Sequence, residues 1–297
     1  MPIDTTPVVD THVHVWDIER SDLYWMTPEL EHLLRPLRRT FTPDDLDPLR
    51  RAVGVDQVVI VQAARSAWDH AWWFRLAETY PWITGVVGWV DLEAPEVGEQ
   101  LDRYRQHPSF RGVRATAENV PDPDWLARPS VRRGIRAVAE RGLTLDLLVR
   151  TEHLPHVPRL AEENPDLRLV VDHLAKPPIA SGELTLWRER MAALVPYPNI
   201  WCKVSGLLTE AGPSPTAEAI RPVVAFALEQ FGVSRLLWGS DWPVSTLAAD
   251  YVATFHTLLE ALGPLAERDR AALFGGNALR VYRLPAGDSP GGLRSAP

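Results

Sequence analysis

The sequence has 297 residues, of which 45% are hydrophobic and 24% charged, enough to bury one large core in a single domain. Its net charge of −8 and the lack of any run of basic residues argue against a nucleic-acid partner. No stretch of roughly 18 apolar residues predicts a membrane span, and the first residues do not read as a signal peptide. The single cysteine, Cys202, fits a reducing compartment and is expected on the packed outer face of a strand. We therefore expect a cytoplasmic protein with no membrane partner.

The first predicted element is a strand at 8–15, within the run V-V-D-T-H-V-H-V-W, where alternate residues change in polarity. Alternation places Asp10, His12 and His14 on one face, and valines with Thr11 on the other. Two imidazoles two positions apart, roughly 7 Å at ~3.3 Å per residue, can aim at one ion or one carbonyl oxygen. The strand therefore predicts one wall of a polar site.

Residues 17–42 form the next segment, a long connection containing Tyr24, Trp25, Met26 and Phe41. Connections of this length are uncommon unless they are functional. Two interpretations stay open: a rim or lid over the site, or a flap packed on the surface.

From residue 44 a helix, a short apolar strand and a polar loop alternate along the chain. Strands are expected near 8–15, 56–63, 84–91, 111–116, 143–149, 168–173, 199–205 and 235–241. Helices are expected near 44–53, 68–80, 95–107, 125–141, 152–164, 183–195, 216–232 and 247–262, with a closing helix at 271–284. Eight such units predict a single α/β domain, a (β/α)₈ TIM barrel over 1–284, followed by a disordered tail at 285–297. A doubly wound open sheet is the alternative, but no G-x-G-x-x-G follows the first strand.

Polar residues at the C-terminal ends of barrel strands face one pocket, so they are the candidate site. Imidazoles, with or without a metal, can polarise a carbonyl, a carboxylate can move a proton, and cationic groups can hold an anionic or hydroxyl-rich substrate. His173 and Asp241 are favoured as functional, whereas Gln62, Trp89 and Ser205 taken singly are more often structural. The candidates are His12, His14, Gln62, Trp89, Asp91, Arg114, Arg150, His153, His173, Lys176, Lys203, Ser205, Ser240 and Asp241.

Other chemistries fit the sequence less well. It has no G-x-S-x-G elbow, no P-loop and no H-E-x-x-H motif. Nucleophilic serine catalysis and this type of zinc-protease site are therefore not expected.

Four ordered motifs carry a family resemblance: D-T-H-V-H at 10–14, D-H-L-A-K-P at 172–177, W-C-K-V-S-G-L at 201–207 and L-L-W-G-S-D-W-P at 236–243. Over about 8–284 the chain resembles the amidohydrolase superfamily. More narrowly, it is similar to the amidohydrolase-2 branch, which includes sugar-lactone hydrolases and 2-pyrone-4,6-dicarboxylate lactonase.

The resemblance implies a histidine pair at His12 and His14, a further catalytic histidine at His173, and Asp241 as general base. It also implies that Arg114 and Lys203 lie near the substrate, and Gln62, Trp89 and His153 are further candidates for substrate binding. One zinc or manganese ion held by His12, His14 and Asp241 is expected if a metal is used, and a metal-independent mechanism stays open.

Two departures from the family pattern bear on the metal. Arg114 stands where two-metal members carry a bridging lysine or glutamate, so a binuclear site is not expected. The strand-five histidine of single-zinc members is missing from L-D-L-L-V-R unless His153 replaces it.

The resemblance implies hydrolysis of a small-molecule lactone, most simply a sugar lactone, by direct attack of water. The alternatives are a metal-dependent decarboxylase of the same superfamily and an inactive ligand-binding barrel.

Overall fold

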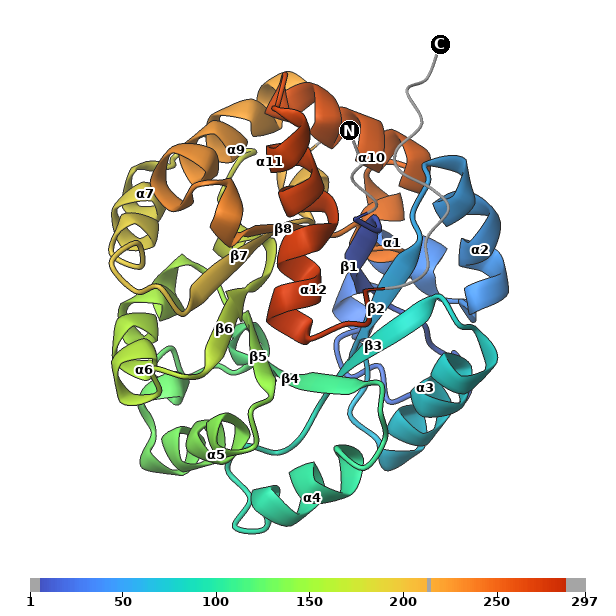
Figure 1. Ribbon diagram of the computed structural model, residues 1–297, viewed down its shortest axis with the longest axis vertical. Coiled ribbons are helices and arrows are strands. Elements are labelled where there is room, and N and C mark those ends of the chain that lie inside the picture. The colour runs from blue at the N-terminus through green and yellow to red at the C-terminus, as the bar shows by residue number, and fades with distance from the viewer. Residues whose placement is uncertain (1–5, 213–214, 287–297) are drawn as a thin grey trace.

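The computed structural model describes residues 6–212 and 215–286, and these form a barrel of eight parallel strands in sequential order (Figure 1). The (β/α)₈ TIM-barrel prediction is confirmed, and each observed strand lies within a few residues of its predicted range. The strands are β1 (Val9–Val13), β2 (Gln57–Val61), β3 (Ile83–Gly88), β4 (Phe110–Thr116), β5 (Thr144–Leu148), β6 (Arg168–Val171), β7 (Ile200–Val204) and β8 (Leu236–Trp238).

The barrel closes between β1 and the segment that follows β8. The Asp241 N–H donates to the His12 carbonyl oxygen at 2.8 Å, and the His14 N–H donates to the Trp242 carbonyl oxygen at 2.7 Å. Closure therefore also brings Asp241 beside both histidines of the first strand.

Helices surround the strands (Figure 1), and their starts follow local sequence signals. The second helix begins at Pro43 after a capping box between Thr42 and Asp45, and the fifth begins at Pro129 rather than at 125, because a 3₁₀ turn comes first. The α-helices are α1 (Glu31–Leu34), α2 (Pro43–Ala52), α3 (Ala67–Thr79), α4 (Val97–Tyr104), α5 (Pro129–Glu140), α6 (Val157–Glu163), α7 (Thr185–Ala192), α8 (Leu207–Glu210), α9 (Ala217–Phe231), α10 (Tyr251–Leu262), α11 (Glu267–Ala271) and α12 (Asn277–Tyr282).

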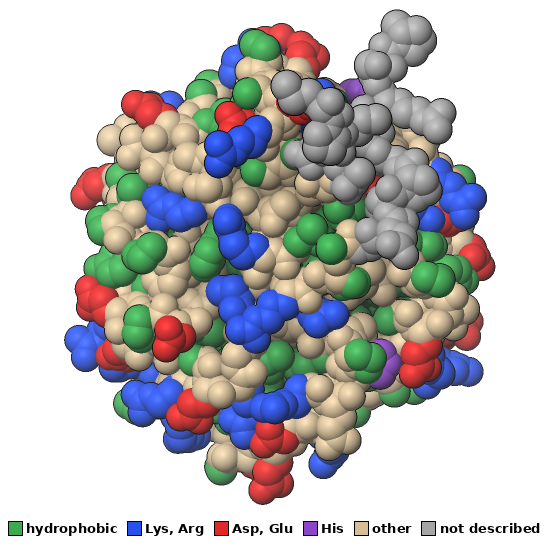
Figure 2. Space-filling view, viewed as in Figure 1, with side chains coloured by type: hydrophobic (Ala, Val, Ile, Leu, Met, Phe, Trp, Pro, Cys, Tyr) green, Lys and Arg blue, Asp and Glu red, His purple; other side chains and the backbone are tan. Residues whose placement is uncertain are grey.

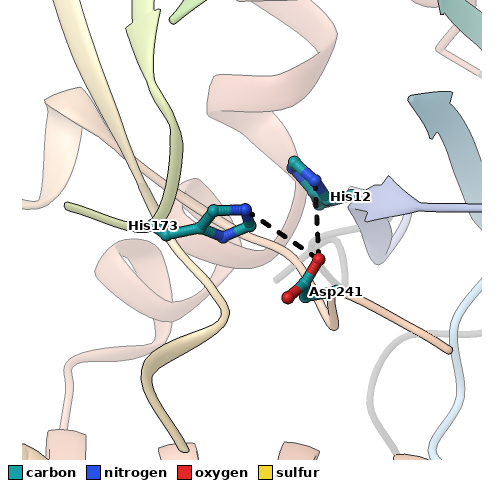
Figure 3. Close-up of side chains that lie close together, drawn as sticks. All are labelled: His12, His173 and Asp241. Carbon is teal, nitrogen blue, oxygen red and sulfur yellow. Dashed lines mark ion pairs between the residues drawn. The ribbon is translucent and has the colours of Figure 1, made fainter. Parts of the chain in front are cut away.

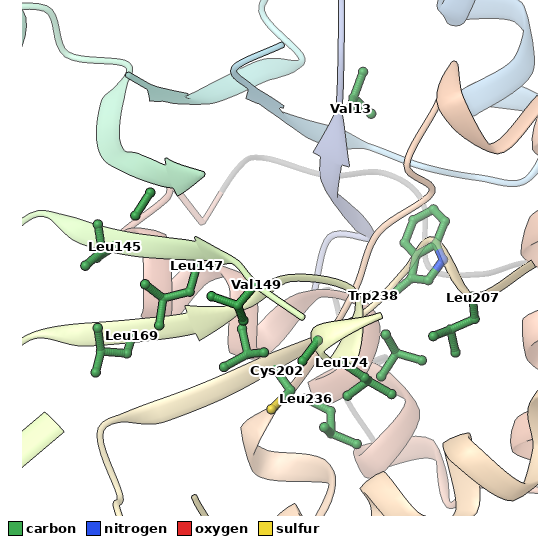
Figure 4. Close-up of a cluster of buried hydrophobic side chains, with 14 of the residues drawn as sticks. Val13, Leu145, Leu147, Val149, Leu169, Leu174, Cys202, Leu207, Leu236 and Trp238 are labelled. Carbon is green, nitrogen blue, oxygen red and sulfur yellow. The ribbon is translucent and has the colours of Figure 1, made fainter. Parts of the chain in front are cut away.

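The main core fills the space between the strands and the helices, and Figure 4 shows part of it. Leu145, Leu147 and Cys202 are buried in this core. The neighbouring Lys203 belongs instead to the polar interior, because successive residues of a strand point to opposite faces. Cys202 is thus a packed outer-face residue, as predicted, and burial raises the pKa of its thiol far above its usual range.

The end of the chain covers the barrel at the N-terminal ends of the strands. The α12 helix crosses this opening in Figure 1, and a π-helical turn, Ala272–Gly276, precedes it. Asn277 donates to the Leu236 carbonyl oxygen at 2.7 Å, and Thr144 donates to the Val281 carbonyl oxygen at 2.8 Å. This arrangement leaves the C-terminal strand ends as the open end of the barrel.

One expectation about β1 is wrong. Asp10 does not share a face with His12 and His14: its carboxylate accepts a hydrogen bond from the Tyr251 hydroxyl of α10 at 2.9 Å. Val9 packs in the barrel interior with residues of α12. The β1–β2 register shifts between Asp10 and Val13, and such an irregularity breaks the simple alternation of faces.

The 17–42 connection combines both interpretations left open by the sequence. Its first part is tied to the segment after β2, because Trp25 donates to the Ala63 carbonyl oxygen at 2.9 Å and Ser21 donates to Asp69 at 2.6 Å. Its second part contains α1, and Leu33 there is 56% exposed. The first part is therefore fastened beside the C-terminal end of β2, and the second part lies partly exposed at the surface.

Figure 2 shows the face covered by α12, where Lys and Arg side chains gather in the middle and acidic side chains lie mainly toward the rim. In the described part of the chain, none of the helices has the length and apolar character that crossing a membrane requires. The predicted tail lies outside the described residues from position 287 onward.

Candidate active site

Three imidazoles surround one carboxylate oxygen at the C-terminal strand ends. Oδ1 of Asp241 lies 3.3 Å from Nε2 of His14, 3.6 Å from Nε2 of His12 and 3.9 Å from Nε2 of His173. Figure 3 shows His12 and His173 pointing toward Asp241. All four residues are buried. The short distances between them show that the structure brings together the three histidines and the aspartate that the sequence singled out.

Unusual backbone places two of these groups. His173 follows β6 in a short 3₁₀ segment, η6 (Asp172–Ala175), and the four residues 173–176 all have positive φ between 49° and 59°. Asp241 follows β8 with φ of 59°. A left-handed backbone is rare for residues with a Cβ and is enriched at functional sites. These turns bring both side chains beside His12.

The outer ring nitrogen of each histidine has its own partner. Nδ1 of His14 lies 2.8 Å from the Val61 carbonyl oxygen, and Nδ1 of His173 lies 2.9 Å from Oγ of Ser205. Nδ1 of His12 lies between Nζ of Lys203 at 3.1 Å and a carboxylate oxygen of Asp172 at 3.4 Å. Partners of this kind fix ring orientation and leave Nε2 facing the centre, as in metal-binding histidines.

The protonation states also suit a cation. Burial lowers the pKa of His12 and of His173, so both imidazoles are neutral at neutral pH. Burial alone would raise the pKa of Asp241. The opposing effect of the three neighbouring histidines is larger and holds that pKa well below its usual range. Neutral imidazoles with an ionised carboxylate are the forms that bind a metal.

His12, His173 and Asp241 can hold a metal ion, because their ligand atoms all lie within 4.8 Å of one another. The set predicted from sequence had His14 in place of His173, and His14 contacts the same oxygen of Asp241 from one side. Nitrogen and carboxylate donors fit zinc. Nη1 of Arg114 lies 3.4 Å from Nε2 of His12 and brings a positive charge to the edge of this group.

A layer of paired charges lies beneath the histidines. Lys203 is fully buried, and its ammonium lies 2.6 Å from Asp146 of β5 and 3.2 Å from Asp172. The Tyr282 hydroxyl of α12 donates to Asp146, with oxygen separations of 2.9 and 3.0 Å. Burial raises the pKa of Asp146 to about 6, against the lowering effect of Lys203. Lys203 and His12 hold the pKa of Asp172 well below its usual range despite burial.

Sequence reasoning missed Asp146 and Asp172. A signal was available for Asp146, because a charged residue within the apolar run T-L-D-L-L requires a buried partner of opposite charge. Lys203, one of only two lysines, was the available cation.

Arg114 and Gln62 form a pair at the edge of the site. Arg114 donates through Nε and Nη2 to Oε1 of Gln62 at 3.1 and 2.7 Å, and through Nη2 to the Gln62 carbonyl oxygen. Its Nη1 faces Asp172 at 3.7 Å. Gln62 is fully buried, so its amide is placed to orient Arg114.

A pocket of about 460 Å³ lies at the C-terminal ends of β3 and β4, lined by residues other than the three histidines and Asp241. Arg114 of its wall connects it to the site, because Nη1 lies 3.4 Å from Nε2 of His12. Trp89, a candidate from the sequence, is one of the residues that line the pocket, and its backbone N–H donates to Nε2 of His70 at 2.9 Å. His153 lies elsewhere, at the start of η5 (Thr151–His156), where its Nδ1 accepts the Arg150 N–H at 3.1 Å. The other pocket residues include Asp22, Arg65, Asp91, Glu93, Thr116 and Trp125.

Comparisons with known proteins agree with this site. A family model described as amidohydrolase matches residues 9–284. An L-fucono-1,5-lactonase from Burkholderia ambifaria is 39% identical over 289 residues, covering 94% of this chain and 97% of the relative. A second L-fucono-1,5-lactonase, from Burkholderia multivorans, is 33% identical and covers 93% and 96% of the two chains. A crystal structure of an amidohydrolase from Burkholderia multivorans with bound zinc matches with a TM-score of 0.87 at 32% identity, covering 94% of this chain and all of that one. The resemblance inferred from the motifs is confirmed, and the chain belongs to the amidohydrolase family.

Proposed function

We propose that the protein is a lactonase that opens the ring ester of a sugar lactone by direct attack of water. The convergence of three imidazoles on Asp241 carries this proposal, and Arg114 joins this group to the pocket. The two lactonase relatives support the substrate class, since each aligns with almost the whole chain.

Asp241 acts as general base in this proposal. Its Oδ1 faces the imidazoles, and its second oxygen takes a proton from the attacking water. The water oxygen bonds to the lactone carbonyl carbon, the ring carbon–oxygen bond breaks, and Asp241 returns the proton to the leaving ring oxygen. The product is an open hydroxy acid, which requires no oxidant and no second substrate.

The histidines stabilise the negative charge that develops on the carbonyl oxygen. We propose that His12, His173 and Asp241 bind one zinc ion, with His14 at its side, because a structural neighbour contains zinc and the donor set fits. When bound, zinc supplies a Lewis acid that polarises the carbonyl. Manganese is the alternative metal.

We propose separate roles for the other predicted residues. Trp89 and Arg114 contact the substrate, because both line the pocket. Lys203 and Gln62 act as positioning residues, because both are fully buried and bonded to groups of the site. His153 is held by Arg150 and acts at most on the loop that follows β5.

The fifth strand does not support the decarboxylase alternative. The interior position of β5 is taken by Asp146, which is paired with Lys203, rather than by a histidine. A cytoplasmic location and the absence of nucleic-acid partners stay predictions.

The test is a hydrolysis screen of five- and six-membered sugar lactones with a pH indicator, run with metal analysis of protein purified without chelator. We expect turnover of a sugar lactone and about one zinc per chain. Activity that survives full removal of metal would overturn the zinc role and leave the histidines and Arg114 to polarise the carbonyl. Release of carbon dioxide from an aromatic acid, without lactone turnover, would overturn the lactonase.

A further inference from the structure

Two arginines line the pocket, and their donors are used very differently. Arg114 donates through Nε and Nη2 to Gln62, and its Nη1 faces His12 and Asp172. Among the described residues, the side chain of Arg65 donates one hydrogen bond, from Nη2 to Oγ1 of Thr116 at 2.9 Å. Its Nε is buried and has no hydrogen-bond partner in the described structure. A guanidinium has five N–H donors, so Arg65 keeps donors for a ligand.

Arg65 is nonetheless held in a defined orientation. Its guanidinium carbon lies 3.4 Å from the ring centroid of Tyr24 and 5.6 Å from that of Trp89. Tyr24 belongs to the 17–42 connection, which Trp25 and Ser21 fasten to the segment after β2. Three elements therefore fix the plane of Arg65: this connection, the end of β3 and the end of β4. A preorganised donor binds a ligand without losing much side-chain freedom.

The remaining pocket wall shows what kind of ligand fits. Asp22, Asp91 and Glu93 are the acidic residues of this wall. The carboxylate of Glu93 already accepts from Trp125 and Arg128, and one oxygen of Asp91 accepts the Glu93 backbone N–H at 2.9 Å. A substrate with two carboxylates would face repulsion here, whereas hydroxyl groups can donate to carboxylates and accept from Arg65. The charge pattern thus favours a neutral, hydroxylated ligand over a dicarboxylate.

We infer that Arg65 determines specificity by donating hydrogen bonds to the hydroxyl groups of a neutral sugar lactone. The 17–42 connection contributes to this specificity because its Tyr24 holds Arg65 in place. This inference rests on the proposed lactonase function, and it concerns the part of the substrate that does not react. Arg65 contacts neither Asp241 nor the histidines, so it acts on binding and selection.

The experiment compares two lactones in wild-type protein, Arg65→Met and Arg65→Lys. One lactone is L-fucono-1,5-lactone, and the other is δ-valerolactone, which has a six-membered ring without hydroxyl groups. We expect Arg65→Met to lose roughly tenfold or more in kcat/KM for the sugar lactone, mainly through KM, and to change little for δ-valerolactone. Arg65→Lys should recover only part of the loss, because an ammonium lacks the planar fork that stacks on Tyr24.

Two further variants serve as controls. Tyr24→Leu should shift KM in the same direction by a smaller factor, since it removes the ring against which Arg65 rests. Arg20→Gln should leave both lactones unaffected: this arginine of the same connection lies over Trp68 at 5.6 Å and its side chain is 67% exposed.

The outcomes separate this inference from the function on which it rests. Equal losses on both lactones in Arg65→Met would assign Arg65 a structural role and overturn the inference, and so would unchanged kinetics on both. Hydrolysis of no lactone by wild-type protein would overturn the lactonase function itself, and the inference with it.

Discussion

Two polar layers lie one above the other inside the barrel, and they use similar residues for different purposes. In the upper layer, at the strand ends, His12, His14 and His173 direct their Nε2 atoms at one oxygen of Asp241. In the lower layer, the charges of Asp146, Asp172 and Lys203 are paired with one another, and Tyr282 completes the group. Groups that converge on a shared point are suited to bind a ligand, and groups whose charges neutralise one another are suited to hold a shape.

The comparison predicts that the lower layer matters most for stability. Lys203→Met should lower the free energy of unfolding by about 3–5 kcal/mol, because it leaves buried carboxylates without their cation. Urea unfolding followed by circular dichroism measures this loss. Lys176→Met is the matched control, as the chain has only these two lysines. Glu118, the partner of Lys176, still has Arg150 at 2.7 Å after this substitution, so little stability should be lost. An equal decrease in the free energy of unfolding in both variants would contradict the stabilising role of the lower layer.

The upper layer should matter for turnover instead. Asp241→Asn should lower kcat by ~10²-fold or more, because an amide cannot take the proton from water. Asparagine tolerates a left-handed backbone, so the fold should survive at φ of 59° and the melting temperature should stay close to that of wild type. Steady-state kinetics on the sugar lactone measures the loss, and near-normal turnover would remove Asp241 from its role as base.

A smaller effect is expected where α12 meets the lower layer. Tyr282→Phe removes the hydroxyl that donates to Asp146 and leaves the ring, which should cost about 2 kcal/mol of stability. Tyr197→Phe is the control, because its hydroxyl donates to Glu162 on the surface and its loss should not be measurable. Chemical denaturation of both variants compares them, and equal stabilities would show that burial of the pair has no effect.

The smallest effect is expected at a link between a histidine and its outer partner. Ser205→Ala removes the hydroxyl beside Nδ1 of His173, which should weaken zinc binding by roughly tenfold. Competition with a chromophoric chelator measures the zinc affinity. Ser181→Ala, at an exposed serine, should leave the affinity unchanged, and identical affinities in both variants would deny Ser205 this role.

The sequence predicted the upper layer far better than the lower one. His12, His14, His173 and Asp241 stand in short motifs at strand ends, where the barrel rule says where they must meet. Asp146 stands alone inside an apolar strand, and its pairing with Lys203 and Tyr282 depends on residues more than fifty positions away. Such pairing follows from barrel register, which local patterns do not encode.

Contacts between segments distant in sequence also explain the other residues whose placement the sequence did not predict. The alternation rule placed Asp10 with the histidines, and the register irregularity of β1 turned it toward α10 instead. Arg65 was not predicted as a site residue, because nothing in the sequence around it differs from an ordinary strand end. Its fixed orientation depends on Tyr24, which belongs to another loop. Strand and helix ranges were predictable because they depend on local periodicity and caps.

Closure of the barrel has a consequence for how the protein is made. The first strand can pair with the segment that follows β8, through His12 and Asp241, only after the ribosome has translated residue 241. Tyr282, the last donor of the lower layer, is translated later still. Until these residues are made, the imidazoles of the first strand lack Asp241 and the carboxylate of Asp146 lacks Tyr282, so the site can assemble only after the last strand and α12 have been translated.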